Sequence, residues 1–226
     1  MTHSPQIKIC GLTIPDQAAQ CAALGADAIG LVFFPPSPRH LELPQARAVV
    51  EAIPQTTLTV GVFVNPEWDF LAATVEQCAL GGVQLHGQEA PEMAARVSDE
   101  LGVRVIKCLF TEKQPGLDLA DRYHVDGYLI ECGKGRLPGG NAMAWNWAAA
   151  AAFARTYPTV LAGGLTPDNV QHAIAAALPD AVDASSGLEA APGRKDLQKV
   201  ERFIAAVRGT TGVYREKGVD SKPVFH

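Results

Sequence analysis

Short apolar runs recur along the whole chain, each four to seven residues long and rich in Val, Ile or Leu. Most of these runs are apolar at successive positions, a pattern typical of strands that a parallel sheet buries on both faces. The runs predict eight strands, over Ile7–Cys10, Ala28–Phe33, Leu58–Phe63, Gly82–His86, Val103–Leu109, Gly127–Glu131, Thr159–Gly163 and Ala181–Ala184.

Helical patterns fill the intervals between these runs. Several of them begin at a Pro and end before a Gly, as helices commonly do. Thr13 and Thr166 are the predicted N-caps of the first and seventh helices, and Gly25 marks the end of the first. The predicted helices are Pro15–Leu24, Pro44–Ala52, Pro66–Ala79, Ala90–Leu101, Leu117–His124, Trp145–Thr156, Thr166–Ala177 and Asp196–Arg208.

The regular alternation of strand and helix determines the predicted fold class. It favours a parallel sheet, and eight units favour closure into a single-domain (βα)8 TIM barrel of the α/β class, for which 226 residues is a usual length. The alternative, an open doubly wound sheet, lacks its G-x-G-x-x-G signature after the first strand. We therefore predict one barrel domain over residues 1–211. Residues 212–226 are polar and without periodicity, and we expect them to form a disordered tail.

Charge and cysteine content exclude several classes of partner. The net charge of −5 argues against a nucleic-acid-binding protein, because such domains usually present a basic face. The five cysteines are odd in number and no pair has C-x-x-C spacing, so we predict reduced thiols in a cytoplasmic protein, with no disulfide and no metal site. Neither a signal peptide nor an apolar stretch of the ~20 residues that cross a bilayer is visible. The expected partner is a small molecule, and the chain is expected to be a monomer or a homodimer.

Cys10 ends the first predicted strand, where a thiol is poorly placed for packing and well placed for chemistry. In a barrel of this kind all strand ends meet at one mouth, which carries the active site. Side chains alternate along a strand, so Lys8 shares the face of Cys10, and we predict that it pairs inside the barrel with Asp183 of the last strand. A nearby ammonium favours the thiolate and makes Cys10 a usable base. The alternative is a buried structural thiol, the role expected of Cys21, Cys78 and Cys108.

The loops after the seventh and eighth strands have the composition of a phosphate site. Barrels of this fold often hold phosphate there. Glycine lets backbone N–H groups approach an anion closely, and serine hydroxyls donate as well. Ordinary turns are the alternative, but two such loops at matching positions favour phosphate. The candidate residues are Gly163, Gly164, Ser185, Ser186 and Gly187.

Four further side chains are expected at the mouth. Arg39 follows a loop stiffened by three prolines, and its planar guanidinium suits a carboxylate, although many arginines are simply solvated. Glu131 ends the sixth strand, almost opposite the first, where a carboxylate does not serve packing. Gln84 and His86 share one face of the fourth strand, and His86 is either a catalyst or a hydrogen-bonded wall residue. The Gly-rich basic loop 133–141 either closes over a ligand or is an ordinary loop, and the sequence does not separate the two.

Taken together, these segments resemble the phosphoribosylanthranilate isomerase family of tryptophan biosynthesis. The resemblance extends from residue 7 to about residue 204, and its motifs are highly specific in combination. The matching segments are Lys8–Thr13, Gly30–Arg39, Val60–Phe63, Val83–Gly87, Leu161–Val170, Val182–Glu189 and Pro192–Asp196.

The resemblance implies an Amadori rearrangement of N-(5′-phosphoribosyl)anthranilate to 1-(2-carboxyphenylamino)-1-deoxyribulose 5-phosphate, without cofactor or metal. By matching position, Cys10 is the implied general base at C2′, and Glu131 stands where the family has the general acid that protonates the ribose ring oxygen. Arg39 is implied to meet the anthranilate carboxylate. The expected substrate-binding residues are then Arg39, Gln84, His86 and Asp183, and the phosphate falls to Gly163, Gly164, Ser185, Ser186 and Gly187.

Two departures from the family pattern lie in one unit of the barrel. The family's acid is an aspartate, whereas Glu131 carries one methylene more. The family's Gly-Gly-Thr/Ser-Gly and Phe-Asp-Trp segments correspond to residues 139–142 and 145–147, and we expect the changed loop to compensate for the longer acid. Two alternative functions stay open. One is the related isomerase of histidine biosynthesis, which has an aspartate where Cys10 stands, and the other is a phosphosugar-binding barrel without catalysis.

Overall fold

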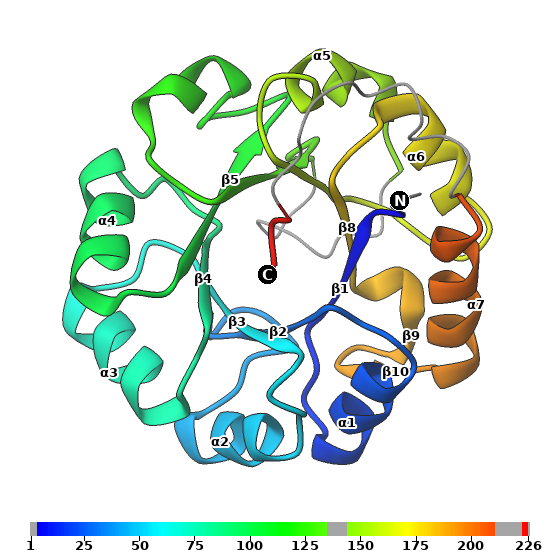
Figure 1. Cartoon of the computed structure of the whole chain (residues 1–226). Helices are drawn as coiled ribbons and strands as arrows, with labels where there is room; N and C mark the ends of the chain where they lie inside the picture. Colours follow the sequence, from blue (N-terminus) through cyan, green and yellow to red (C-terminus); the bar gives the residue numbers. More distant parts are fainter. Residues whose placement is uncertain (1–3, 135–143, 211–222, 226) are drawn as a thin grey trace.

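Eight parallel strands close into a barrel in chain order, with β1 paired to both β2 and β8 (Figure 1). The structure is a computed structural model that describes residues 4–134, 144–210 and 223–225. The closed barrel confirms the predicted (βα)8 fold, and every predicted strand is present. The strands are β1 Gln6–Cys10, β2 Ala28–Val32, β3 Leu58–Phe63, β4 Gly82–Leu85, β5 Arg104–Phe110, β6 Gly127–Glu131, β7 Thr159–Leu161 and β8 Ala181–Ala184.

Helices surround the barrel, as Figure 1 shows in a view along its axis. The α-helices are α1 Pro15–Ala23, α2 Leu43–Glu51, α3 Trp68–Cys78, α4 Pro91–Arg96, α5 Ala151–Ala154, α6 Val170–Ala177 and α7 Leu197–Arg208. Three predicted helices are wound differently from a regular α-helix. Helix α4 continues into the π-helical turn η1 (Val97–Leu101), η2 (Leu117–Arg122) is a 3-10 helix, and the 3-10 turn η3 (Trp147–Ala150) precedes α5.

Both predicted N-caps are wrong. Helix α1 begins after Ile14, and the Thr13 hydroxyl instead donates to the carbonyl oxygen of Gly193, at 2.6 Å. The N-cap of α6 is Asn169, whose Oδ1 accepts from the backbone N–H of Thr166, at 2.8 Å. A small hairpin after β8 was not predicted from the sequence, and the hydrogen bond from Thr13 joins it to the loop after β1. Its parts are η4 Ser186–Leu188, β9 Glu189–Ala191 and β10 Arg194–Lys195.

Side chains alternate along each strand between two apolar regions. Outward-facing residues such as Ile9, Ile29 and Ile130 pack in one cluster with residues of the surrounding helices. Inward-facing residues such as Val60 and Leu129 form a second cluster inside the barrel. Burial on both faces explains why the strands read as continuous apolar runs.

The C-terminal end of the chain packs into the barrel from the end where the strands begin. Val224 and Phe225 are 0% and 2% exposed and belong to the inner apolar cluster, and Figure 1 shows this end at the centre of the barrel. The backbone N–H of Phe225 donates to Oε1 of Gln6, the first residue of β1, at 3.0 Å. A Cβ on Gly127, the first residue of β6, would lie 2.8 Å from Val224 Cγ1. For residues 223–225 this packing differs from the expected disordered tail, which stays a prediction for the rest of residues 212–226. Residues 212–222 and 226 lie outside the described part of the chain.

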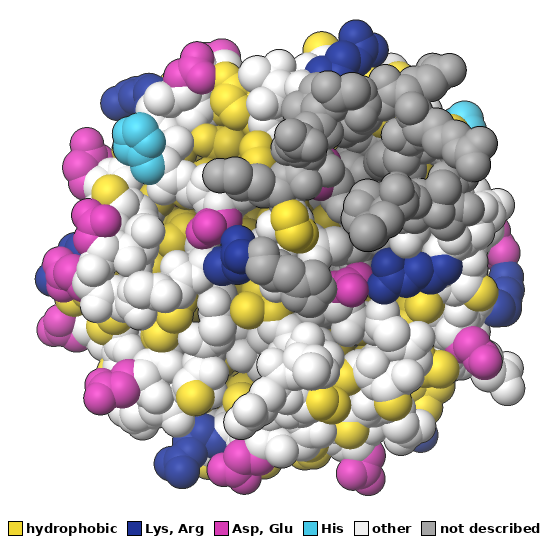
Figure 2. Space-filling view, viewed as in Figure 1, with side chains coloured by type: hydrophobic (Ala, Val, Ile, Leu, Met, Phe, Trp, Pro, Cys, Tyr) yellow, Lys and Arg dark blue, Asp and Glu magenta, His cyan; other side chains and the backbone are white. Residues whose placement is uncertain are grey.

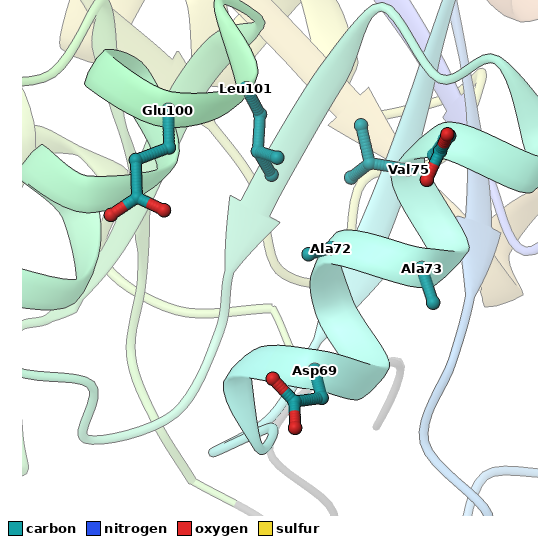
Figure 3. A pocket seen from close by; sticks show the side chains of 7 residues that line it. Asp69, Ala72, Ala73, Val75, Glu100 and Leu101 are labelled. Carbon is teal, nitrogen blue, oxygen red and sulfur yellow. The ribbon is translucent and has the colours of Figure 1, made fainter.

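The outer surface is mixed in charge. Acidic and basic side chains are interspersed around the rim of the face in Figure 2. No helix among the described residues is both long and apolar enough to cross a membrane. A surface pocket lies in the helical ring between α3 and η1 (Figure 3), away from the predicted site at the strand ends. Its lining residues are Asp69, Ala72, Ala73, Val75, Glu76, Glu100 and Leu101.

Candidate active site

The predicted strand residues face into the barrel. Their immediate neighbours Ile9, Ile130 and Val182 pack outward against the helices, so alternation turns the residues beside them inward. Cys10 and Glu131 are the last residues of β1 and β6, and both therefore lie at the same rim, as predicted. The strand residues that face inward include Lys8, Cys10, Gln84, Glu131 and Asp183.

A buried ion pair lies beside the Cys10 thiol. Lys8 Nζ donates to Asp183 Oδ1 at 2.9 Å, which confirms the predicted pairing. A Cβ on Gly30 of β2 would lie 2.7 Å from Cys10 Sγ and 3.1 Å from Lys8 Nζ, so the thiol and the ammonium share the space above this glycine. Burial alone would lower the pKa of Lys8, but the Asp183 carboxylate and Cys10 outweigh it and raise that pKa. Lys8 thus remains charged beside the Cys10 thiol.

Arg39 is buried at the mouth, so the alternative of a solvated arginine is wrong. Its Nε and Nη2 donate to the two carboxylate oxygens of Glu189, at 2.8 and 2.6 Å. The Arg39 stem crosses directly over Gly11, whose φ of +76° and lack of a side chain make room for it. The bidentate pair uses two of the five guanidinium N–H groups and fixes the direction of the fork.

Glu189 links Arg39 to the loop after β8. Lys195 Nζ donates to Glu189 Oε1 at 2.9 Å and to the carbonyl oxygen of Ser185 at 3.2 Å. Burial alone would raise the pKa of Glu189, but the hydrogen bonds and charges of Arg39 and Lys195 lower it. A carboxylate that is ionised at neutral pH therefore connects the predicted carboxylate-binding arginine with the predicted phosphate loop.

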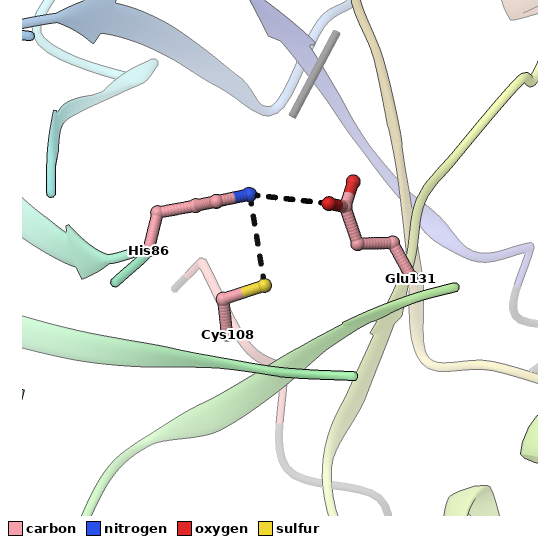
Figure 4. A group of neighbouring side chains, drawn as sticks. All are labelled: His86, Cys108 and Glu131. Carbon is pink, nitrogen blue, oxygen red and sulfur yellow. Dashed lines mark hydrogen bonds and ion pairs between the residues drawn. The ribbon is translucent and has the colours of Figure 1, made fainter. Parts of the chain in front are cut away.

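Glu131 lies in a second buried cluster, with His86 and Cys108 (Figure 4). His86 Nε2 is 3.5 Å from Glu131 Oε1 and 3.7 Å from Cys108 Sγ. His86 Nδ1 is 2.7 Å from the side-chain nitrogen of Gln84. Burial alone would lower the pKa of His86, but Cys108 and Glu131 raise it well above its ordinary value, whereas burial raises the pKa of Cys108. The imidazole is therefore positioned to donate toward the Glu131 carboxylate.

The two predicted phosphate loops lie against each other. A Cβ on Gly187 would collide with the carbonyl oxygen of Leu165, so the loops after β7 and β8 touch at the backbone. Gly163 and Gly164 have φ values of +89° and +69°, which only glycine adopts without strain. Asn169 Nδ2 donates to the Gly164 carbonyl oxygen at 2.9 Å and holds this turn.

The substituted tryptophan segment also supports the loop after β7. Trp145 Nε1 donates to the carbonyl oxygen of Ala162 at 2.9 Å, and Trp147 Nε1 donates to that of Gly163 at 3.2 Å. Residues 135–143, which hold most of the Gly-rich basic loop and the altered segment 139–142, lie outside the described residues. The expected closure of that loop stays a prediction.

Three residues of this site were not predicted from the sequence. Glu189 and Lys195 lie within segments that matched the family pattern, but nothing in their spacing indicated a pair with Arg39. Cys108 was expected to be a structural thiol, and the structure places it beside His86. The available signal was the alternation along β5. Cys108 lies two residues before Phe110 and therefore shares its inward face, and both belong to the inner cluster.

The chain is similar to known proteins over nearly its whole length. The family model described as N-(5′-phosphoribosyl)anthranilate (PRA) isomerase matches residues 7–206. A protein of that name from Desulfatibacillum aliphaticivorans is 46% identical over 218 residues, which is 96% of this chain and 96% of the relative.

Solved structures give the same result. The crystal structure of phosphoribosyl anthranilate isomerase from Thermotoga maritima has a TM-score of 0.82 at 32% identity, covering 91% of this chain and 99% of the other. A crystal structure of a phosphoribosyl anthranilate isomerase in complex with reduced 1-(o-carboxyphenylamino)-1-deoxyribulose 5-phosphate has a TM-score of 0.79 at 31% identity, with the same coverage of 91% and 99%.

Proposed function

Because the chain belongs to the N-(5′-phosphoribosyl)anthranilate isomerase family, we propose that Cys10 and Glu131 are the base and the acid of its rearrangement. The chain is an isomerase of tryptophan biosynthesis and converts an aminoaldose into an aminoketose. One observation carries the assignment: both residues end strands of one closed barrel and face inward at the same rim.

The reaction is balanced within the substrate. Glu131 gives its proton to the ring oxygen as the bond from that oxygen to C1′ breaks, and the anthranilate nitrogen lone pair forms the C1′=N bond. The Cys10 thiolate then removes the C2′ proton, and the C–H electrons form C1′=C2′ while the nitrogen recovers its lone pair. Protonation at C1′ and loss of the C2′ hydroxyl proton give the ketone. C1′ is reduced and C2′ is oxidised, so no external oxidant or cofactor is needed.

The surroundings of Cys10 support its role as the base. Lys8 is fully buried and paired with Asp183, so its charge has a fixed position beside the thiol. A fixed positive charge stabilises the thiolate before the substrate arrives and requires no rearrangement during proton transfer. Asp183 holds Lys8 in place, and we propose a positioning contribution for it in addition to the expected contact with the sugar.

The surroundings of Glu131 fix the position of the proposed acid. His86, which follows β4 two strands away from β6, lies 3.5 Å from its carboxylate, and Gln84 contacts the other ring nitrogen of His86. This chain of contacts fixes the direction of the longer glutamate side chain. Placement matters because a displacement of ~1 Å costs on the order of a hundredfold in rate.

Other groups at the mouth are proposed to bind the substrate. Arg39 has N–H groups beyond the two that bind Glu189, and we assign them to the anthranilate carboxylate. The backbone of Gly163, Gly164 and Gly187 and the hydroxyls of Ser185 and Ser186 are assigned to the phosphate. The phosphate contacts orient the sugar and do not react.

Replacement of Glu131 tests the assignment. Glu131→Gln keeps the shape but has no acidic proton, so turnover measured by loss of substrate fluorescence should fall at least ~100-fold. Glu131→Asp, which restores the residue of the family pattern, should retain far more activity. The exposed Glu100→Gln serves as a surface control and should match the wild type. A Gln variant with near full activity would remove Glu131 from the mechanism.

The alternatives differ in what they predict. Cys10 and the proline-rich Arg39 loop favour the anthranilate substrate over that of the histidine-pathway isomerase, whose family carries an aspartate at the Cys10 position. A barrel that only binds phosphosugars would bind the fluorescent substrate without consuming it, and it would not rescue a tryptophan-requiring strain that lacks this isomerase. We further propose a cytoplasmic location. Sedimentation of the purified chain would separate the monomer from the homodimer.

A further inference from the structure

The cluster of His86, Cys108 and Glu131 contains a residue that the isomerase mechanism does not use. Cys108 is fully buried, and its sulfur lies close to His86 Nε2 (Figure 4). The imidazole nitrogen, the sulfur and a carboxylate oxygen all lie within 4.8 Å of one another. We propose that these three residues form a binding site for a divalent transition-metal cation, with Zn²⁺ as the best fit, and that its occupation inhibits the isomerase.

Two of the three separations between the ligand atoms fit a tetrahedral zinc ion. With zinc–nitrogen and zinc–oxygen bonds of about 2.0–2.1 Å and a zinc–sulfur bond of about 2.3 Å, tetrahedral angles place nitrogen about 3.6 Å from sulfur and about 3.3 Å from oxygen. The corresponding distances in the site are 3.7 Å and 3.5 Å. A charge-assisted hydrogen bond between imidazole and carboxylate would be shorter, at about 2.7–2.9 Å. The two separations therefore match those of a tetrahedral zinc site, and the metal would replace the long contacts that His86 makes with Glu131 and Cys108.

The chemistry of the ligands fits the same class of ion. Imidazole, thiolate and carboxylate are the zinc ligands of proteins, and a set of three leaves a fourth position for water or another ligand. The thiolate selects against Mg²⁺ and Ca²⁺, which prefer oxygen ligands throughout. All three residues are buried at or near the carboxyl ends of neighbouring strands, at the rim where we propose that the substrate binds.

Gln84 is placed to support a metal-bound imidazole. A histidine that binds metal through Nε2 carries its proton on Nδ1 and donates it to a neighbouring oxygen. The Gln84 amide lies 2.7 Å from this Nδ1, and its Oε1 is buried without a hydrogen-bond partner among the described residues. A half-turn of the amide, whose oxygen and nitrogen have nearly the same shape, brings that oxygen onto the Nδ1 proton.

Metal binding would stop the proposed reaction at its first step. An ion bound to Glu131 displaces the proton that this residue must give to the ribose ring oxygen. It also places a bound water where the sugar has to sit. Inhibition is therefore a consequence of the site's position and rests on the proposed role of Glu131, whereas binding itself does not depend on that role.

The first experiment measures binding without activity. The whole metal-free protein is titrated with Zn²⁺ in competition with a chromogenic chelator, and with Co²⁺ followed by its thiolate charge-transfer absorption. We expect one equivalent of tight binding and a thiolate band. Cys108→Ser should abolish the band and weaken Zn²⁺ binding at least ~100-fold, because it removes a direct ligand where loss of an indirect one already costs 10–100-fold.

Two matched cysteine variants make the result specific to Cys108. Cys78→Ser removes another buried thiol, the last residue of α3, and Cys10→Ser removes the proposed base. Both should keep one equivalent of Zn²⁺ and the band. His86→Gln provides a second disruption of the site in case Cys108→Ser folds poorly, which circular dichroism reveals. Loss of the band in Cys10→Ser, its persistence in Cys108→Ser, or the lack of stoichiometric binding would each overturn the proposal.

The second experiment measures inhibition. Zn²⁺ should inhibit the wild type and Cys78→Ser at the concentration at which it binds, and a chelator should restore turnover. Cys108→Ser should need at least ~100-fold more Zn²⁺ for the same fractional inhibition, whatever its own basal rate. Stoichiometric binding without inhibition would refute the inhibitory part and would also contradict Glu131 as the acid, whereas failure of binding leaves the proposed isomerase mechanism untouched.

Discussion

Phe225→Ala tests how firmly the C-terminal end is bound inside the barrel. Phe225 is 2% exposed and lies in the inner apolar cluster with residues at the strand starts, including Ala28 and Ala181. These small residues, together with Gly127, leave the space that Val224 and Phe225 fill. Removing the ring therefore opens a cavity that the rigid barrel wall cannot close.

The expected loss of stability has an upper limit set by the chain end. Truncating a buried phenylalanine in a closed core costs about 3–5 kcal/mol. Here the terminal segment can detach from the barrel, so the loss of stability cannot exceed the free energy with which this segment packs. Burial of Val224 and Phe225 contributes about 1.5–3 kcal/mol each, and ordering their backbone costs about 1–2 kcal/mol per residue. A loss of about 2 kcal/mol remains, which corresponds to about 4–8 °C in Tm for a chain of this size.

The assay is thermal unfolding followed by circular dichroism, with two comparison variants. Deleting residues 223–226 should lower Tm by about as much as Phe225→Ala, because both undock the segment. Phe70→Ala removes a ring that is 42% exposed on α3 and meets Phe63 edge-on, so it should cost only about 0.5–1.5 kcal/mol, less than Phe225→Ala. Turnover at 25 °C should stay close to that of the wild type, because the site lies at the other end of the strands. A Phe225→Ala variant as stable as Phe70→Ala would refute the packing described above.

Three further changes test the site. Lys8→Met leaves Asp183 buried without its partner, so the free energy of unfolding should fall by about 3–5 kcal/mol. Alkylation of Cys10 by iodoacetamide at neutral pH should also slow, because the nearby ammonium is gone. An unchanged alkylation rate would show that Lys8 does not activate the thiol. Gly30→Ala places a methyl group 2.7 Å from Cys10 Sγ, so kcat should fall on the order of a hundredfold through displacement of the thiol, and retention of full activity would contradict that position. Glu189 has a lower pKa folded than unfolded, so protonation favours unfolding: its contribution is present at neutral pH and is lost as the pH falls below about 4.5. Tm measured against pH should therefore fall less steeply on the acid side in Glu189→Gln than in the wild type, and parallel curves would show that the Arg39 pair adds no pH-dependent stability.

The sequence predicted the strand-end positions because their pattern is local. Alternation along β1 places Lys8 with Cys10, and barrel closure brings Asp183 beside Lys8, so the buried pair followed from period and topology alone. The Arg39–Glu189 pair did not follow, because it joins two loops whose paths no periodicity encodes. Thr13 shows the same limit, since it has the residue type of an N-cap and instead bonds to the turn of an unpredicted hairpin.

The neighbours of Glu131 explain why a glutamate can stand where the family pattern has an aspartate. On one side, a Cβ on Gly163 would lie 3.4 Å from Glu131 Cβ and 2.7 Å from Trp145 Nε1, so the tryptophan occupies the space beside the base of the glutamate side chain. On the other side, His86, at the end of β4, lies 3.5 Å from the carboxylate. The longer side chain is thus supported at its base by a residue of the altered segment 145–147 and at its tip by the imidazole. If this pairing positions the acid, His86→Gln should lower kcat of the wild type more than that of the Glu131→Asp variant, because the shorter side chain reaches less far toward His86. Equal losses in the two backgrounds would show that His86 acts on the substrate and not through Glu131.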